Sequence, residues 1–152
     1  DIYSSPMSQG TRCHQLATYI VFDSPLVMLC DAPTAYRKEP ECTRFIAGLP
    51  VVADETRILQ GKMGEYIVTA RRVGEDWIVG GLTDWEARTV DLDLSFLPEG
   101  MFRAEIFCDG INADKKGEDY RHEYRDVKRE DRLKMQLAPG GGFAIRLKKN
   151  HN

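Results

Sequence analysis

The sequence of 152 residues lacks the features that mark membrane-spanning and nucleic-acid-binding proteins. No apolar run approaches the ~20 residues that a transmembrane helix requires. The 24 acidic and 21 basic residues are well mixed, so no basic face is evident that would bind nucleic acid. Internal repeats and low-complexity segments are also missing. The composition, with 42% hydrophobic residues, is that of a folded globular protein.

Cysteine is scarce and is not arranged for metal binding. The four residues are Cys13, Cys30, Cys42 and Cys108, and none forms the Cys-x-x-Cys pair of a zinc site. Buried thiols are the simplest interpretation for those in apolar segments. A Cys30–Cys42 disulfide in an oxidising compartment stays open as an alternative.

The start of the chain lacks an initiator methionine. Residues 1–3 are Asp-Ile-Tyr, without the basic and apolar regions of a signal peptide. Either processing removed an earlier segment, or the chain is a piece of a longer protein. The pattern of the following residues favours a piece.

The first third of the chain predicts a helix, a strand and a second helix. Residues 11–22 carry apolar side chains at helical spacing, residues 26–30 form a short apolar run, and residues 40–47 begin with Pro and are followed by Gly48. One strand and two helices cannot close a core, so residues 1–48 are interpreted as the end of a larger α/β unit. Without that unit, we expect the apolar faces of residues 11–30 to be exposed and to cause self-association or poor solubility.

From residue 49 onward the pattern changes to short β-strands, centred on residues 76–85. This stretch is the densest run of β-forming residues and is flanked by similar runs. About eight strands, separated by turns, predict a mainly β domain over residues 49–152, an antiparallel β-sandwich of jelly-roll or Greek-key type. The expected strands are 54–59, 65–73, 76–84, 87–94, 101–108, 120–127, 132–137 and 143–147.

Few residues suggest chemistry. Asp31 follows the apolar run 26–30, at the end of a strand where barrel active sites lie, and is a candidate pocket-rim residue; capping the turn before Pro33 is the alternative. Trp77 and Trp85 share one face of an unbroken strand, where packing between the sheets is the first interpretation and a sugar-binding platform the alternative.

The loop after the strand 101–108 contains oxygen-bearing side chains at short spacing. Asp109, Asn112 and Asp114 lack the spacing of a calcium-binding loop of the helix-loop-helix type. Aspartate, asparagine and glycine are also turn formers, so an ordinary loop is expected here.

Several long stretches resemble glycoside hydrolase family 97, the α-glucosidases and α-galactosidases of polysaccharide-degrading bacteria. Residues near the start resemble the end of the family's catalytic barrel, and the later ones its C-terminal domain. The matching stretches are residues 9–17, 24–33, 39–42, 64–72, 76–88, 107–114 and 138–143.

The resemblance implies a parent enzyme with an N-terminal β-supersandwich, a (β/α)8 barrel and a C-terminal β-sandwich. Residues 1–48 would then be the last helix–strand–helix of the barrel. Such enzymes act on α-linked gluco- or galacto-oligosaccharides with a calcium ion near the active site, and they are periplasmic or secreted. The catalytic carboxylates and calcium ligands belong to earlier segments, so no catalytic, cofactor or metal-binding residue is assigned in this chain.

By the same resemblance, the sandwich would pack against the missing barrel and support a homo-oligomer, while the isolated chain would be non-catalytic. A carbohydrate-binding β-sandwich module is the alternative, and a structural domain without a ligand is a third. The residues that decide between glucosides and galactosides, and between inversion and retention, are not expected in this chain.

Overall fold

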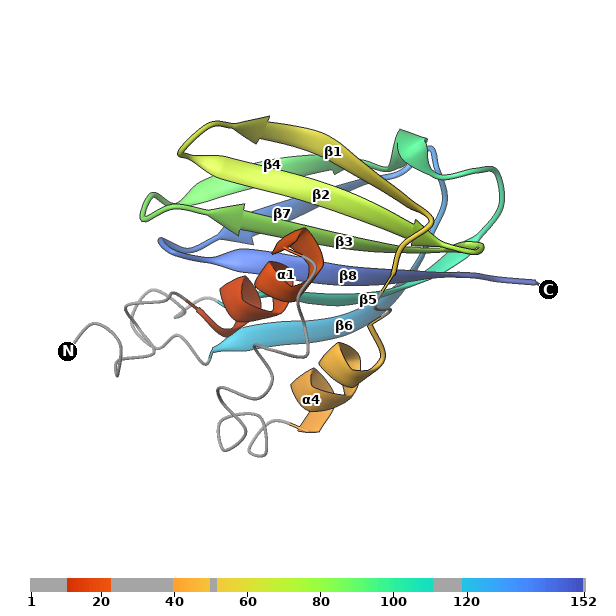
Figure 1. The fold of residues 1–152 in the computed structure, drawn as a ribbon, viewed down its shortest axis with the longest axis horizontal. Coiled ribbons are helices and arrows are strands. Elements are labelled where there is room, and N and C mark those ends of the chain that lie inside the picture. Colours follow the sequence, from red (N-terminus) through yellow and green to blue (C-terminus); the bar gives the residue numbers. More distant parts are fainter. Residues whose placement is uncertain (1–10, 23–39, 50–51, 111–118, 152) are drawn as a thin grey trace.

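A computed structural model describes residues 11–22, 40–49, 52–110 and 119–151 of the chain. Within them, strands form two antiparallel sheets that face each other, and two helices lie on the outer face of the larger sheet (Figure 1). The elements are α1 (Arg12–Phe22), α4 (Pro40–Ala47), β1 (Glu55–Lys62), β2 (Tyr66–Val73), β3 (Asp76–Thr83), β4 (Arg88–Asp93), η2 (Leu94–Phe96), β5 (Phe102–Asp109), β6 (Tyr120–Val127), β7 (Arg132–Leu137) and β8 (Gly142–Lys149).

The larger sheet has six strands in the order β1-β2-β3-β8-β5-β6, and the smaller sheet pairs β4 with β7. The chain therefore crosses between the sheets before and after β4, and again before and after β7. The last strand, β8, completes the large sheet by pairing with both β3 and β5. The predicted mainly β sandwich is confirmed.

Strand boundaries depart from the sequence prediction in one informative place. Residues 60–62, expected in a turn, extend β1 because they pair with residues 66–68 of β2. A register shift between Ile58 and Gln60 bends this edge strand. The predicted strand at residues 26–30, Asp31 and Cys30 lie outside the described residues.

The space between the two sheets is an apolar interior. Strict alternation in β4 and β7 turns Val90, Leu92 and Leu133 inward and leaves their neighbours exposed. Opposite them lie fully buried side chains of the large sheet, including Phe102 and Phe143. We call this the inner interior.

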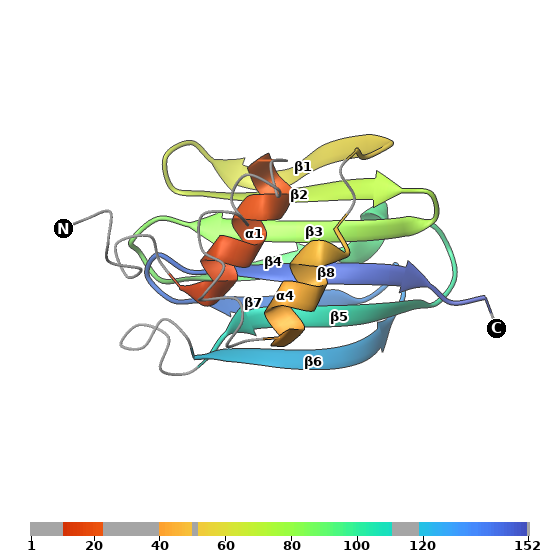
Figure 2. The same cartoon turned by 60° about the horizontal axis from the view of Figure 1, so that its bottom comes forward.

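A second apolar interior lies on the other face of the large sheet. There, α1 and α4 cross the strands side by side (Figure 2). Leu16, Ile20 and Phe45 from the helices pack with Ile78 and Phe107 from the sheet, and all five are at most 4% exposed. We call this the outer interior. The expectation that the apolar face of the first helix is exposed is wrong for residues 11–22, because the sheet itself covers it.

Two neighbouring glycines in β3 allow both interiors to close. A Cβ atom on Gly80 would lie 2.9 Å from Ile20 Cβ, so only glycine lets α1 approach this closely. A Cβ atom on Gly81 would lie 2.2 Å from the ring of Phe143 on the opposite face. Residues 76–85 therefore form the layer that separates the two interiors. No helix in the described part of the chain is long and apolar enough to cross a membrane.

Candidate functional site

One end of the sandwich collects most of the polar side chains that contact each other in the interior or at its rim. At this end α1 begins, β3 ends and β8 begins (Figure 1). Backbone hydrogen bonds join the segments: Thr11 N–H donates to the carbonyl of Gly140 (3.0 Å), and Gly140 N–H donates to the carbonyl of Asp84 (2.6 Å). We call this region the α1 end.

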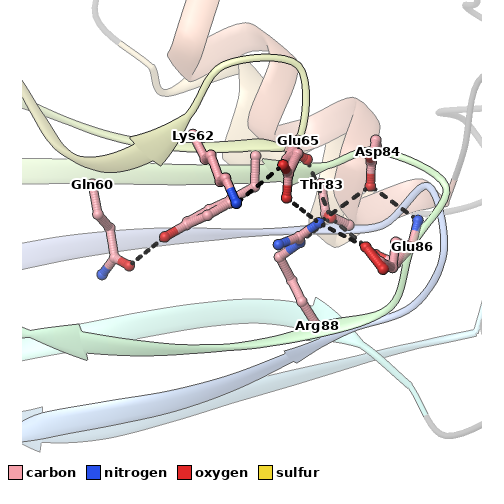
Figure 3. Close-up of polar contacts among 8 residues, drawn as sticks. Gln60, Lys62, Glu65, Thr83, Asp84, Glu86 and Arg88 are labelled. Atoms are coloured by element: carbon pink, nitrogen blue, oxygen red, sulfur yellow. Dashed lines mark hydrogen bonds and ion pairs between the residues drawn. The ribbon is translucent and has the colours of Figure 1, made fainter.

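Arg88 is the centre of a polar network at the α1 end (Figure 3). It begins β4 in the small sheet and reaches across to the large sheet, where its Nε donates to Thr83 Oγ1 at 2.7 Å. Its Nη2 lies 3.4 Å from Asp84, 3.5 Å from Glu86 and 3.7 Å from Glu65. Its guanidinium also stacks over the ring of Tyr66 at 4.9 Å.

This network is suited to structure more than to glycoside hydrolysis. Hydrolysis needs two carboxylates placed roughly 5–10 Å apart on either side of a sugar. Here the three carboxylates converge on a single guanidinium that is only 18% exposed, so all three are paired with the same cation. The cation links the two sheets and closes the end of the sandwich.

An apolar groove of about 700 Å³ lies beside this network. Its walls come from the β1–β2 hairpin, the end of β3 and His14 of α1. Ile58 and Met63 are strongly exposed in the same region, at 69% and 100%. The burial of His14 lowers the pKa of its imidazole, while the Gly141 carbonyl that contacts Nδ1 opposes this shift. Two carboxylates line the groove, those of Glu65 and Asp84, and both are paired with Arg88.

Asp109, at the end of β5, is a buried anchor for α1. It is 5% exposed and accepts three hydrogen bonds, from Thr11 Oγ1 (2.7 Å), Ala138 N–H (2.9 Å) and Gly142 N–H (3.1 Å). Burial raises the pKa of its carboxyl to about 6, and these hydrogen bonds oppose the shift. Thr11 Oγ1 also accepts from His14 N–H at 3.1 Å, which caps the helix.

A second pocket, of about 620 Å³, opens next to Asp109. Arg121, Gln136 and Pro139 are among the residues that line it. The Arg121 guanidinium donates to Cys108 Sγ at 3.2 Å, and burial raises the pKa of that thiol. Because the Asp109 carboxylate already accepts three hydrogen bonds from protein donors, its role here is positional. The sequence predicted only a loop at Asp109, and Asn112 and Asp114 lie outside the described residues.

A histidine between two glutamates fastens α4 to the large sheet. His122 of β6 contacts Glu41 of α4 through Nδ1 and Glu105 of β5 through Nε2, both at 2.8 Å. Its ring stacks on Phe107 at 4.2 Å, and the Tyr120 hydroxyl donates to Glu41. That hydrogen bond, with His122 beside it, lowers the pKa of the Glu41 carboxyl. Burial raises the pKa of the Tyr120 phenol, and Glu41 adds to this shift.

The two tryptophans differ in location, contrary to the expectation that both face one side. Trp77 lies in the inner interior at 2% exposure, with Phe96 edge-on at 5.0 Å, so it cannot serve as a sugar platform. The strand ends at Thr83, and Trp85 turns outward at 61% exposure, so its predicted packing between the sheets is wrong. Trp85 rests on Gly140, where a Cβ atom would lie 2.5 Å from the ring.

Arg88 and His122 were not among the residues predicted from the sequence, although both carry a periodic signal. Arg88 has the same parity as Val90 and Leu92, which marks a charged side chain at an inward position. His122 shares a face with Tyr120 and Tyr124 on β6. Among the described residues, no three histidine, cysteine or carboxylate side chains converge as metal ligands.

Comparison with known proteins gives consistent matches. The sequence profile described as "Glycosyl-hydrolase 97 C-terminal, oligomerisation" matches residues 52–148. A retaining alpha-galactosidase of Bacteroides thetaiotaomicron is 58% identical over 146 residues, which cover 96% of this chain and 22% of that protein. A "Probable retaining alpha-galactosidase" of Streptomyces bingchenggensis is 30% identical over 130 residues, which cover 86% and 19%.

Solved structures show the same relationship. A glycoside hydrolase family 97 enzyme from Pseudoalteromonas sp. strain K8, in complex with acarbose, superposes with a TM-score of 0.84 at 33% identity. The match covers 93% of this chain and 23% of that enzyme. The chain thus spans about a fifth of the length of each of these relatives.

Proposed function

Because this chain belongs to glycosyl hydrolase family 97, with the family's C-terminal oligomerisation domain at residues 52–148, we propose that it is the C-terminal part of a retaining α-galactosidase. The 58% identity to the Bacteroides thetaiotaomicron retaining alpha-galactosidase carries this proposal. The chain itself supplies support and assembly, and the reaction takes place in the preceding part of the enzyme.

The packing of the helices is evidence that this chain supports the preceding part of the enzyme. Residues 11–22 and 40–49 precede the family's sandwich domain in sequence, yet they share the outer interior with it. The helices are held at their ends by Asp109 and by His122, which are residues of the large sheet. A domain joined to the preceding segment by a common apolar interior holds that segment in a fixed position, which a flexible linker does not.

The full-length enzyme tests the reaction. It should hydrolyse p-nitrophenyl α-galactoside much faster than p-nitrophenyl α-glucoside, and proton NMR should detect the α-anomer of galactose as the first product. The chain of 152 residues alone should hydrolyse neither substrate. Preference for the glucoside, or initial release of the β-anomer, would contradict the proposed activity. Turnover by the isolated chain would contradict the supporting role.

The calcium ion and the cellular localisation of the enzyme are proposed from the family resemblance. From that resemblance we propose that a calcium ion is bound in the preceding part of the enzyme. Metal analysis of the full-length enzyme against the isolated chain checks this assignment. A periplasmic or secreted enzyme is also proposed, and fractionation of the producing cells checks it.

Carbohydrate binding by the sandwich remains the second candidate function, and the exposure of Trp85 is the observation that favours it. Substitution W85F leaves Trp77 as the only tryptophan of the chain, and Trp77 is buried in the inner interior. If Trp85 binds sugar, galacto-oligosaccharides change the tryptophan fluorescence of the unmodified chain and leave that of W85F unchanged. Equal, flat titrations of both proteins reject this function.

A further inference from the structure

The two edges of the large sheet differ in how well they can accept another strand. β1 forms one edge, and its register shift between Ile58 and Gln60 interrupts the regular row of backbone groups. β6 forms the other edge and pairs with β5 over residues 120–127 without a shift. No strand in the described part of the chain covers the outer edge of β6. This edge offers a regular row of backbone donors and acceptors.

The side chains of β6 alternate in a way that is complementary to themselves. Glu123 and Arg125 lie on one face, with Arg125 Nη2 2.6 Å from Glu123 Oε2. Two copies of β6 that pair around a two-fold axis perpendicular to the sheet place residues directly opposite when their numbers sum to a constant even value. Centring that axis on Glu123 or on Arg125 opposes two like charges.

Centring the axis on Tyr124 gives a favourable register. Each Glu123 then lies opposite Arg125 of the other copy, and each His122 lies opposite Asp126. The two Tyr124 side chains, each 52% exposed, meet at the axis. A register centred on His122 also opposes unlike charges, but it leaves residues 125–127 of each strand unpaired. The Tyr124 register alone uses the strand from Arg121 to Val127.

We propose that the outer edge of β6 binds β6 of a second copy of this chain, antiparallel and centred on Tyr124, so that the two large sheets become continuous. This interface rests on the assembly role proposed above, and it identifies the surface through which the chain assembles. The charged side chains on the edge of β6 then make the pairing selective, because they oppose pairing with an unrelated strand or in a shifted register. They favour the pairing of identical copies around a two-fold axis.

Sedimentation velocity of the isolated chain across a concentration series tests the interface. The unmodified chain should form a dimer as its concentration rises. E123R and R125E should each lower the association constant by about tenfold or more, because each places two like-charged pairs across the axis. An equimolar mixture of E123R and R125E should restore the dimer, since the arginines at positions 123 and 125 of one copy then face glutamates of the other.

The matched control is R57E on the opposite edge. Arg57 contacts Glu55 on β1 much as Arg125 contacts Glu123 on β6, and it is similarly exposed, at 49% against 53% for the side chains. This variant should dimerise like the unmodified chain. A monomer at every concentration, dimers of E123R and R125E that match the unmodified chain, or a mixture that does not associate would overturn the interface. The activity of the full-length enzyme is measured separately, so failure of this interface is distinguishable from failure of the proposed reaction.

Discussion

The two apolar interiors on either side of the large sheet are built differently. The inner interior is formed by strands on both sides, and its cluster of buried residues consists of apolar side chains, Trp77 and Cys108. The outer interior is formed by helices on a sheet, and its rim carries the titratable residues Asp109, Glu41 and His122. The inner interior is closed at one end by the ion pairs of Arg88, whereas the outer interior is bordered by Asp109, a buried carboxyl whose pKa is raised to about 6.

This difference explains how the large sheet can pack against strands on one face and against helices on the other. Between the sheets, alternation in every strand is enough to bury the apolar face. The helices have no such register with the strands, so specific contacts locate them: Gly80 sets the approach of α1, Asp109 holds its first residue, and His122 holds α4. The outer interior should therefore be the more sensitive to pH and the easier to open.

The largest effect is expected from emptying the inner interior. F143A removes a fully buried ring that packs over Gly81 and leaves a cavity that the strands cannot close. The free energy of unfolding should fall by about 3–5 kcal/mol, measured by urea denaturation of the isolated chain. A loss below about 1 kcal/mol would show that the inner interior is loosely packed, and it would remove the contrast with the outer interior.

A matched truncation in the outer interior should have a smaller and more local effect. L16A removes a fully buried side chain of α1 and should cost about 2–5 kcal/mol. Because the inner interior remains intact, amide exchange should accelerate first in α1 and least in β4 and β7. Uniform acceleration in all elements would mean that the two interiors open as one unit.

The pH dependence of stability should trace to Asp109. Its pKa of about 6 in the folded state lies above the value in an unfolded chain, so the folded state holds this proton more tightly. The stability from this group is complete below about pH 4, declines as pH rises through 6, and is lower by about 3 kcal/mol at pH 7. D109N removes this titration and can still accept from both backbone N–H groups while donating to Thr11.

Thermal unfolding of D109N and of the unmodified chain, followed from pH 4 to pH 7, measures this effect. The variant should gain relative stability as the pH rises. D93N is the control of opposite sign, because the Ser95 backbone N–H lowers the pKa of exposed Asp93. That variant should be less stable than the unmodified chain throughout pH 4 to pH 7, and should match it only at a pH below the lowered pKa of Asp93. Parallel curves for D109N and the unmodified chain would remove the pH contrast between the interiors.

The smallest effect is expected at the rim, where α4 meets the sheet. E41A removes the carboxylate that binds Tyr120 and His122, and should cost about 1 kcal/mol, because the site is partly open to water. R44A, on an exposed position of the same helix, is the matched control. Amide exchange in α4 should accelerate in E41A and not in R44A. Equal behaviour of the two would show that the rim contacts do not hold the helix.

The sequence predicted local structure better than it predicted contacts between elements. Alternation in residues such as Val90, Leu92 and Leu133 placed the strands, and Pro40 with Gly48 marked the bounds of α4, because these signals depend on neighbouring residues. The position of β8 between β3 and β5 is set by pairing across long sequence separations, which no local pattern records.

The same limit applies to the polar residues. Asp109 was expected in a simple loop, and its contact with Thr11 spans 98 positions. Trp85 was expected to continue the face of Trp77, but the strand ends at Thr83 and the backbone turns before the second ring. Coverage of the first helix by the large sheet depends on Gly80, whose role is visible only when Ile20 lies above it. The assignment of residues 1–48 to a barrel stays a prediction.

Native-state amide exchange of the isolated chain tests most directly whether the helices and the sandwich form one body. The shared outer interior predicts that the amides of Leu16, Tyr19 and Ile20 in α1 are strongly protected from exchange. Their protection should approach that of the amides in β3 and β8. Exchange of the α1 amides at the rate of an unfolded peptide, with the strands still protected, would contradict this account. The helices would then belong to another part of the enzyme and only rest on the sandwich.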